Sequence, residues 1–258
     1  MATTADGTHG THGTETAARV AVVIGGSRGI GRAIVERLTR DGLHVVFSYA
    51  TNEQAAKEVL EAVRTHDGEA RALQADLARL DQVRALFDEA ERRYGRLDVC
   101  VCNAATGRLV TIADATEEDY DAVMGANAKG TFFAMQEAAR RLREGGRIVN
   151  LSTLNTVLAA PSNALYQGSK GAIEQFTRVA ARELGARGIT VNAVAPGATD
   201  TDLLRSMNPP ESLASIPRLT PLGRLGTPED IARVVAFLVG PDSGWITGQV
   251  IFAGGGIV

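Results

Sequence analysis

Short apolar runs alternate with amphipathic helical patterns along this chain of 258 residues, and this alternation restricts the fold more than any other feature. The runs are short and almost continuously apolar, which is typical of strands buried on both faces. Strands that alternate with helices build a parallel sheet covered on both sides. The sequence therefore predicts an α/β fold with a doubly wound parallel sheet of about seven strands in a single domain. The predicted strands are 20–24, 45–49, 70–75, 97–102, 147–151, 189–194 and 248–252.

Two segments fall outside this alternation. Residues 1–18 are rich in Thr, Gly and Ala and repeat the triplet Thr-His-Gly, which predicts a disordered leader ahead of a folded domain at 19–258. Residues 202–226 are rich in proline and show little periodicity. A loop of that length in a compact domain is usually functional, so we expect it to act as a substrate loop or lid.

A glycine-rich turn joins the first predicted strand to the first predicted helix. Residues 25–31 read Gly-Gly-Ser-Arg-Gly-Ile-Gly, with the spacing G-x-x-x-G-x-G. Such a turn lets backbone N–H groups approach a pyrophosphate at the positive end of a helix. The alternative interpretation is a tight turn that only packs the helix on the sheet.

The residues after the second predicted strand bear on the choice of cofactor. In folds that prefer NAD, an Asp or Glu near this strand end binds the ribose 2′-hydroxyl. Here residues 48–52 read Ser-Tyr-Ala-Thr-Asn, and no acid occurs before Glu53. Arg28 lies in the glycine-rich turn, where it could meet a 2′-phosphate. Together these features favour NADP(H), although Arg28 could also simply be solvated.

Tyr166 and Lys170 lie four residues apart on the predicted helix 166–184, so they share one face of it. A nearby ammonium favours phenolate, so we expect Lys170 to lower the pKa of Tyr166 from about 10. A phenol tuned in this way can donate a proton to a carbonyl oxygen or accept one from an alcohol. The alternative is an exposed pair without chemistry. However, only three of the 27 basic residues are lysines, which suggests a role for Lys170 that arginine performs poorly.

Several polar residues are predicted to gather at one edge of the sheet. Asn103, Thr153 and Pro196 each follow a predicted strand, and ligands of such sheets bind beyond the carboxyl ends of the strands. Asn127 falls within a helix predicted from Thr116 towards residue 143. An amide in that position competes with backbone hydrogen bonds, so Asn127 is either a satisfied residue in a kink or part of a site.

Composition excludes several classes of function. A net charge of −3 gives no reason to expect nucleic acid or an anionic membrane as a partner, and no apolar run reaches the ~18 residues of a membrane span. Without the regions of a signal peptide, the chain is expected to be cytoplasmic. Cys100 and Cys102 are interpreted as small core residues in a reducing compartment, and no metal site is expected. No histidine lies near residues 147–170, which disfavours Ser-His-Asp chemistry.

Taken together and in this order, the motifs resemble those of the classical short-chain dehydrogenase/reductase family over about residues 19–258. The resemblance implies a Rossmann-type fold, a nicotinamide cofactor, hydride transfer to a carbonyl and usually a homotetramer. It is closest to 3-oxoacyl-acyl-carrier-protein reductases and related ketoreductases. The motifs that carry it are Gly25-x-x-x-Gly29-Ile30-Gly31, Asp76-Leu77, Asn103-Ala104-Ala105, Asn127, Tyr166-x-x-x-Lys170 and Pro196-Gly197-x-x-x-Thr201.

The same resemblance implies roles for individual residues. Tyr166 would be the acid and base, Lys170 would hold the nicotinamide ribose and tune Tyr166, and Asn127 would anchor a water of the proton relay. The catalytic set is therefore Asn127, Thr153, Tyr166 and Lys170. Asp76 would meet the adenine and Thr201 the carboxamide. The cofactor-binding set is Gly25, Ser27, Arg28, Gly29, Ile30, Gly31, Ser48, Asp76, Leu77, Asn103, Ala104, Tyr166, Lys170, Pro196, Gly197, Thr199 and Thr201.

Two adjacent hydroxyls compete for one role in this set. Side chains alternate faces as the chain leaves a strand, so only one of Ser152 and Thr153 can face Tyr166. Ser152 has the residue type that the family prefers, whereas Thr153 has the spacing, 13 residues before Tyr166. Because register decides the face, we expect Thr153 to donate a hydrogen bond to the carbonyl oxygen and Ser152 to bond nearby backbone.

The chain also departs from the family pattern. Ile24, Ala105 and Ala253 replace the usual Thr, Gly and Asp, at positions that are mostly structural. Arg187 falls where the reductases use a basic residue to dock a carrier protein, but Glu144 occupies another such position, which disfavours a carrier-bound substrate.

The expected function is NADPH-dependent reduction of a ketone or 3-oxoacyl-type carbonyl to a secondary alcohol. The substrate would be a small carbonyl or alcohol, either free or carrier-bound. The alternatives are an NAD(P)-binding regulatory protein without turnover, a secondary-alcohol dehydrogenase acting in the oxidative direction, and a hydrolase or dehydratase on the same fold.

Overall fold

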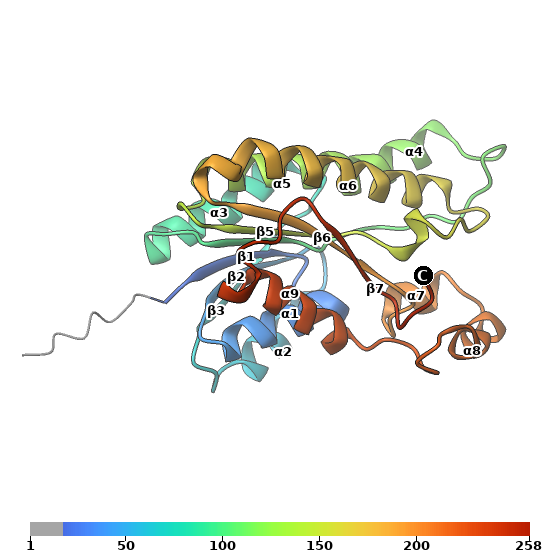
Figure 1. Cartoon of the computed structure of the whole chain (residues 1–258), viewed down its shortest axis with the longest axis horizontal. Coiled ribbons are helices and arrows are strands. Elements are labelled where there is room, and N and C mark those ends of the chain that lie inside the picture. Colours follow the sequence, from blue (N-terminus) through green and yellow to red (C-terminus); the bar gives the residue numbers. More distant parts are fainter. Residues whose placement is uncertain (1–17) are drawn as a thin grey trace, which may run out of the picture.

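The computed structural model describes residues 18–258, and these form one seven-stranded parallel sheet between two layers of helices (Figure 1). The strand order is β3-β2-β1-β4-β5-β6-β7, which confirms the predicted doubly wound sheet. The expected leader, 1–18, lies almost wholly outside the described residues. The strands are β1 Val20–Ile24, β2 His44–Tyr49, β3 Ala70–Gln74, β4 Val99–Cys102, β5 Arg147–Leu151, β6 Thr190–Pro196 and β7 Val250–Ala253.

The alternation of side chains along the strands explains why the apolar runs are continuous. In β1, Ala21 and Val23 pack in one hydrophobic cluster, while Val20, Val22 and Ile24 pack in the other. The first cluster lies under α1, α2 and α9, and the second under α3, α5 and α6, on opposite faces of the sheet (Figure 1). These helices are α1 Gly29–Arg40, α2 Glu53–Ala62, α3 Leu80–Tyr94, α5 Gly130–Arg141, α6 Ala164–Leu184 and α9 Pro228–Val239.

The strand order reverses between β1 and β4, which are hydrogen-bonded neighbours at the centre of the sheet. Strands β2 and β3 extend the sheet to one side and β5–β7 to the other. At such a switch point the loops after the strands diverge, and they leave a crevice at the carboxyl edge of the sheet. The cysteines of β4 are free and buried in its core, as predicted.

The helix that was predicted from Thr116 towards residue 143 is interrupted. It consists of α4 (Glu117–Met124), a π-helical turn (Gly125–Lys129) and α5. Thr116 caps α4 with Asp119 in a capping box, as the acid-rich start suggested. Asn127 lies in the π-helical turn and is fully buried. Single π turns widen a helix locally and frequently occur at functional sites.

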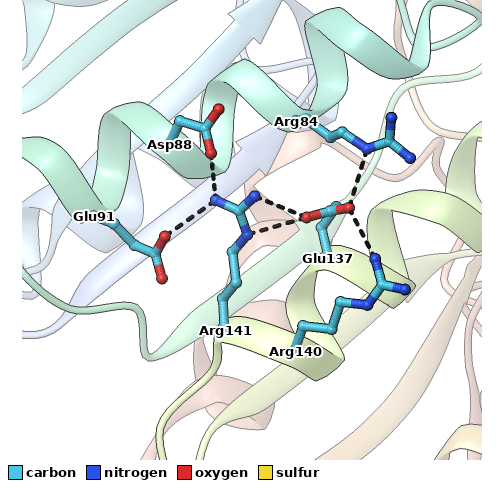
Figure 2. Close-up of polar contacts among 6 residues, drawn as sticks. All are labelled: Arg84, Asp88, Glu91, Glu137, Arg140 and Arg141. Carbon is cyan, nitrogen blue, oxygen red and sulfur yellow. Dashed lines mark hydrogen bonds and ion pairs between the residues drawn. The ribbon is translucent and has the colours of Figure 1, made fainter.

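A network of ion pairs holds α5 against α3 (Figure 2). The Arg141 guanidinium bonds Asp88 at 2.5 Å and Glu91 at 3.0 Å on α3, and Glu137 at 2.9 Å on its own helix. Arg84 of α3 reaches Glu137 at 3.2 Å. Glu137 is only 4% exposed, and a buried carboxylate requires such paired donors. The network thus fixes the helix that begins where the π-helical turn ends.

The prediction of a long loop at 202–226 is wrong in part, because this segment contains two short helices. They are α7, Asp202–Ser206, and α8, Pro210–Leu219. The Thr201 hydroxyl caps α7 by accepting from Leu204 N at 3.2 Å. Pro210 occupies the first turn of α8, where the missing N–H costs nothing and the fixed φ favours the helix. Of the prolines that suggested a loop, Pro209 and Pro210 thus begin a helix, whereas Pro217 lies inside it and Pro221 follows it.

No helix among residues 18–258 is both long enough and apolar enough to cross a bilayer.

Candidate functional site

A cavity of about 750 Å³ opens at the carboxyl edge of the sheet, over the switch point. It extends from the glycine-rich turn and the end of β2 to the end of α6 that carries Tyr166, and α7 and α8 cover part of it. Two residues of the predicted sets, Gly31 and Asn127, do not line it. All others do: Gly25, Ser27, Arg28, Gly29, Ile30, Ser48, Asp76, Leu77, Asn103, Ala104, Thr153, Tyr166, Lys170, Pro196, Gly197, Thr199 and Thr201.

Close packing shapes the glycine-rich turn. A Cβ on Gly31 would lie 1.8 Å from the Gly25 carbonyl oxygen, so this position packs the start of α1 rather than lining the cavity. Gly25 has φ +81°, a conformation that glycine adopts readily. The Ser48 hydroxyl accepts from Gly25 N at 2.8 Å, and the Asn103 amide donates to Gly25 O at 2.7 Å. Strands β2 and β4 thus hold the turn against the amino end of α1.

This turn fits a dinucleotide phosphate. The first N–H groups of a helix have no partner within it, and here those of Gly29 and Ile30 belong to residues that line the cavity. No acid lies in the first turn of α1, so nothing there repels an anion. The loop after β6 approaches this turn, because a Cβ on Gly29 would lie 3.2 Å from Thr201 Cγ2.

Arg28 is exposed at the cavity wall, and its guanidinium has no ion pair or hydrogen bond within residues 18–258. The end of β2 lines the cavity with Ser48 and residues 49–52, none of them acidic. The acids in the cavity wall are Asp76 and Asp202. Asp76 Oδ1 accepts from Ala78 N at 2.9 Å, which fixes the turn after β3.

Thr153 and Tyr166 both line the cavity. Burial raises the pKa of Tyr166 to about 12, and a hydrogen bond from Thr153 opposes this rise. The prediction that Lys170 lowers the pKa of Tyr166 is therefore wrong for the cofactor-free chain. Spacing along a helix brings the two residues to one face, but desolvation of the phenolate is the largest cause of the shift, and the opposing cause is Thr153 rather than Lys170. A phenol with this pKa is protonated at neutral pH and is ready to donate.

Lys170 is 2% exposed, and its ammonium donates to Leu151 O at 2.7 Å. Its Nζ lies 5.7 Å from the centre of the Tyr166 ring. Burial lowers the pKa of Lys170 to about 8. The strand β5 and the helix α6 thus hold an ammonium in the floor of the cavity.

The hydroxyls of Ser152 and Thr153 point to different partners, in the register expected. Ser152 is 4% exposed and donates to Glu174 Oε1 at 2.7 Å, whereas Thr153 reaches Tyr166. The expectation that Ser152 bonds nearby backbone is wrong, because its hydroxyl bonds this carboxylate of α6. Glu174 was not among the residues singled out from the sequence.

Asn127 is held just outside the cavity. Its Oδ1 accepts from Thr106 N at 2.8 Å, while its Nδ2 donates to Thr106 O at 2.8 Å and to Ser169 Oγ at 3.0 Å. The amide therefore ties the loop after β4 to α6. The sequence left open whether Asn127 is a satisfied residue in a kink or part of a site. In the structure its amide is fully hydrogen-bonded in an irregular turn, and it also contacts Ser169 on the helix that carries Tyr166.

The far end of the cavity is mostly apolar, and sequence patterns did not identify it. Its residues come from loops and from the short helices α7 and α8, which no periodic pattern indicated. The principal apolar residues are Leu109, Leu158, Leu203, Met207, Ile216 and Leu219.

Within residues 18–258 no three His, Cys, Asp or Glu side chains form a group that could hold a metal ion.

Comparison with known proteins agrees with this site. Residues 24–258 match a family model described as enoyl-(acyl carrier protein) reductase. The chain is 42% identical to an uncharacterized oxidoreductase of Methylorubrum extorquens over 93% of this chain and 97% of that protein. It is 40% identical to the versicolorin reductase of Emericella nidulans, over 92% and 95% of the two chains. A solved structure of an angucycline C-6 ketoreductase with bound NADP is 40% identical, with a TM-score of 0.87 over 93% and 95%.

The sheet, the glycine-rich turn and the matches define an oxidoreductase with a nicotinamide cofactor. The chain belongs to the classical short-chain dehydrogenase/reductase family, and its relatives include ketoreductases.

Proposed function

We propose that this protein reduces a neutral, largely apolar ketone to a secondary alcohol with NADPH. The observation that carries the proposal is the position of the Thr153–Tyr166 pair and Lys170 in one cavity, between a phosphate-binding turn and an apolar end. NADPH, when bound, supplies the hydride. The reaction adds this hydride to the carbonyl carbon and a proton to the carbonyl oxygen.

The side chains supply what the carbonyl oxygen needs. Tyr166 is protonated at neutral pH and donates its proton to the oxygen as negative charge develops there. Thr153 donates a hydrogen bond to the same oxygen and stabilises that charge. Lys170 would hold the nicotinamide ribose of the bound cofactor, and Asn127 holds the loop that follows β4 against α6. The segment 202–226, with α7 and α8, closes over the substrate.

The cofactor preference rests on the phosphate end of the cavity. The Arg28 guanidinium has no partner within the described residues, and it lines the same cavity as a strand end that lacks an acid. It is therefore available for a 2′-phosphate, with which arginine forms charge-assisted hydrogen bonds. The remaining members of the predicted cofactor set position the pyrophosphate, adenine and carboxamide around this contact.

The substrate class rests on the opposite end. Its wall is built from aliphatic side chains and Met207, and the charged residues of the cavity lie elsewhere, in the cofactor half and at Asp202. The names of three relatives refer to hydroxynaphthalene, versicolorin and an angucycline, and the first of these is a bicyclic ring system by its chemical name. We therefore favour a cyclic or polycyclic ketone over a carrier-bound 3-oxoacyl chain.

The state of Arg187 supports the same choice. A carrier protein would need this arginine free, but its Nε bonds Glu144 at 2.8 Å, and its other nitrogens bond the carbonyls of Ala139 and Leu142. These contacts compete with an acidic partner for the same guanidinium.

Oligomeric state and location are part of the proposal. Large apolar side chains are exposed in two separate places, Phe132 (44%) and Val179 (54%) on α5 and α6, and Trp245 (100%) and Phe252 (43%) at the β7 edge. A tetramer with dihedral symmetry needs at least two different interfaces, and these two groups of residues are candidates for them. We propose a cytoplasmic homotetramer, and light scattering during gel filtration would test the assembly.

The function is tested by mixing the protein with NADPH or NADH and a panel of ketones, and following the loss of cofactor absorbance. We expect turnover of 1-decalone or 2-tetralone with NADPH and little turnover of acetoacetyl thioesters. Binding of NADPH without turnover of any ketone would favour a regulatory protein. Faster turnover of a secondary alcohol with NADP⁺ at neutral pH would favour a dehydrogenase.

A further inference from the structure

We infer that Glu174 is a positioning residue, whose carboxylate holds the segment that carries Thr153 in its working orientation. This inference rests on the proposed function, in which Thr153 donates to the carbonyl oxygen. Glu174 lies eight residues after Tyr166 on α6 and is 7% exposed. A buried carboxylate is stable only where donors surround it, so its partners show what it holds.

Those partners flank Thr153 on both sides. Glu174 Oε1 accepts from Ser152 Oγ at 2.7 Å and from Thr156 Oγ1 at 2.8 Å. Ser152 precedes Thr153 by one residue, and Thr156 follows it by three. One oxygen atom thus bridges the two ends of the short segment that contains the hydroxyl donor. Hydrogen bonds to an ionised carboxylate are shorter and stronger than neutral ones.

The segment has few other fixed points beyond the end of β5. Ser152 N still bonds Val194 O of the neighbouring strand at 2.7 Å. The chain then forms a 3₁₀ turn, Leu154–Thr156. The hydrogen bond from Thr156 N to Thr153 O, 3.2 Å long, lies within this segment and does not attach it to the rest of the protein. The Thr156 hydroxyl has two acceptors within reach, Thr153 O at 3.0 Å and Glu174 Oε1 at 2.8 Å, and the shorter of these contacts joins the turn to α6.

The 3₁₀ turn Leu154–Thr156 also orients the Thr153 hydroxyl. Thr153 Oγ1 accepts from Asn155 N at 3.3 Å, which leaves its single O–H proton to be donated elsewhere. The donation is directed to the Tyr166 side of the cavity. If the turn rotates, the acceptor contact with Asn155 and the direction of the proton change together. Glu174 therefore acts on the donor without touching the substrate.

The second carboxylate oxygen of Glu174 has a more distant charged neighbour. Its Oε2 lies 4.0 Å from Arg178 Nη2, one turn further along α6, so the hydrogen bonds of the carboxylate are those of Oε1 with Ser152 and Thr156. A merely structural role is the competing explanation, in which Glu174 only fastens α6 to β5.

The chain offers a matched control for that explanation. Asn150 of β5 donates to Thr177 Oγ1 of α6 at 2.9 Å, and both residues are fully buried. This bond also fastens α6 to β5, but it lies further from Thr153 along both elements. Thr177→Val should lower the melting temperature and leave kcat unchanged, whereas a positioning residue must change kcat.

The experiment is a double-mutant cycle between Glu174→Ala and Thr153→Val, with kcat for a ketone that the parent reduces. We expect Glu174→Ala to lower kcat by about tenfold to a hundredfold, the size of effect that a displaced catalytic group produces, with the Kd for NADPH unchanged. In the Thr153→Val background the same change should cost less than about threefold, because the two residues act as a unit. Glu174→Gln keeps an acceptor oxygen and should recover most of kcat.

Full additivity in the cycle, or a parent-like kcat in Glu174→Ala, would overturn the inference. If Thr153→Val and Tyr166→Phe also retain the parent kcat, the proposed function itself fails. A crystal structure of Glu174→Ala decides the question without turnover. We expect the Thr153 hydroxyl to have left Tyr166, and an unchanged contact between them would refute the role assigned to Glu174.

Discussion

Lys170 should make the folded protein less stable at neutral pH than an apolar residue in the same place would. The residue is 2% exposed, and the hydrogen bond found for its ammonium within residues 18–258 goes to one carbonyl, Leu151 O. Burial lowers the pKa of Lys170 from 10.5 to about 8. The substitution Lys170→Met keeps the length and apolar stem of the side chain and removes the charge, so it isolates this effect.

The expected magnitude follows from that pKa. One pKa unit corresponds to about 1.4 kcal/mol, so burying the charged form costs the folded state about 3 kcal/mol below pH 8. Lys170→Met removes this cost but leaves Leu151 O without its donor, which costs about 1–3 kcal/mol. At pH 7 the variant should therefore be about as stable as the parent or more stable, by up to about 2 kcal/mol.

The dependence on pH is the sharper test, because the lost hydrogen bond affects every pH alike. The folded pKa lies below the unfolded one, so between pH 8 and 10.5 the unfolded parent holds a proton that the folded parent has lost. The free energy of unfolding of the parent should rise over this window relative to Lys170→Met, by about 3 kcal/mol in total.

The assay is urea unfolding of the cofactor-free parent and variant at matched protein concentrations from pH 7 to 10.5. Lys129→Met is the control, because Lys129 is exposed and its difference from the parent should not vary with pH. A constant difference between parent and Lys170→Met across this range would refute the reasoning, since it would mean that the ammonium is solvated. The variant should also lose reductase activity, so Lys170 would reduce stability while serving the cofactor.

Three further predictions concern the reaction itself. Tyr166→Phe should lower kcat by about 10²–10⁴-fold while NADPH still binds in a fluorescence titration, and turnover within tenfold of the parent would exclude Tyr166 as the acid. Arg28→Ala should raise KM for NADPH by about ten- to a hundredfold and leave KM for NADH nearly unchanged; equal efficiency of the parent with both cofactors would contradict the role of Arg28. Thr153→Val should lower kcat by about 10²–10³-fold and Thr153→Ser should stay active, whereas Ser152→Ala should lose much less; the reverse ranking in steady-state assays would show that Ser152 is the donor.

The sheet could be predicted because buried parallel strands leave a direct trace in the sequence. Strands β1 and β4 are apolar at every position, because each packs against one hydrophobic cluster on each face of the sheet. The different faces of Ser152 and Thr153 were predictable for a similar reason, because alternation is a property of the extended backbone. Both inferences depend on local geometry alone.

Other features depend on contacts that the sequence does not display. The π-helical turn at Gly125–Lys129 accompanies the bonds of Asn127 to Thr106, which lies 21 residues earlier in the chain. Helix α8 begins at a proline that also fits a loop. The pKa of Tyr166 was predicted in the wrong direction because helical spacing gives the neighbour but not the burial.

Glu174 shows what kind of pattern could have revealed more. Tyr166, Lys170, Glu174 and Thr177 follow one another at helical spacing on the face of α6 that packs against β5, where apolar residues would be expected. Each has a polar partner at the end of β5 or just after it: the Thr153 hydroxyl, the Leu151 carbonyl, the Ser152 hydroxyl and the Asn150 amide, respectively. A row of polar residues on a buried helix face must have partners opposite it. The proposed catalytic pair thus belongs to a row of polar contacts between α6 and the end of β5, in which we assign Glu174 to the segment that carries Thr153, whereas the bond between Asn150 and Thr177 fastens the helix to the strand.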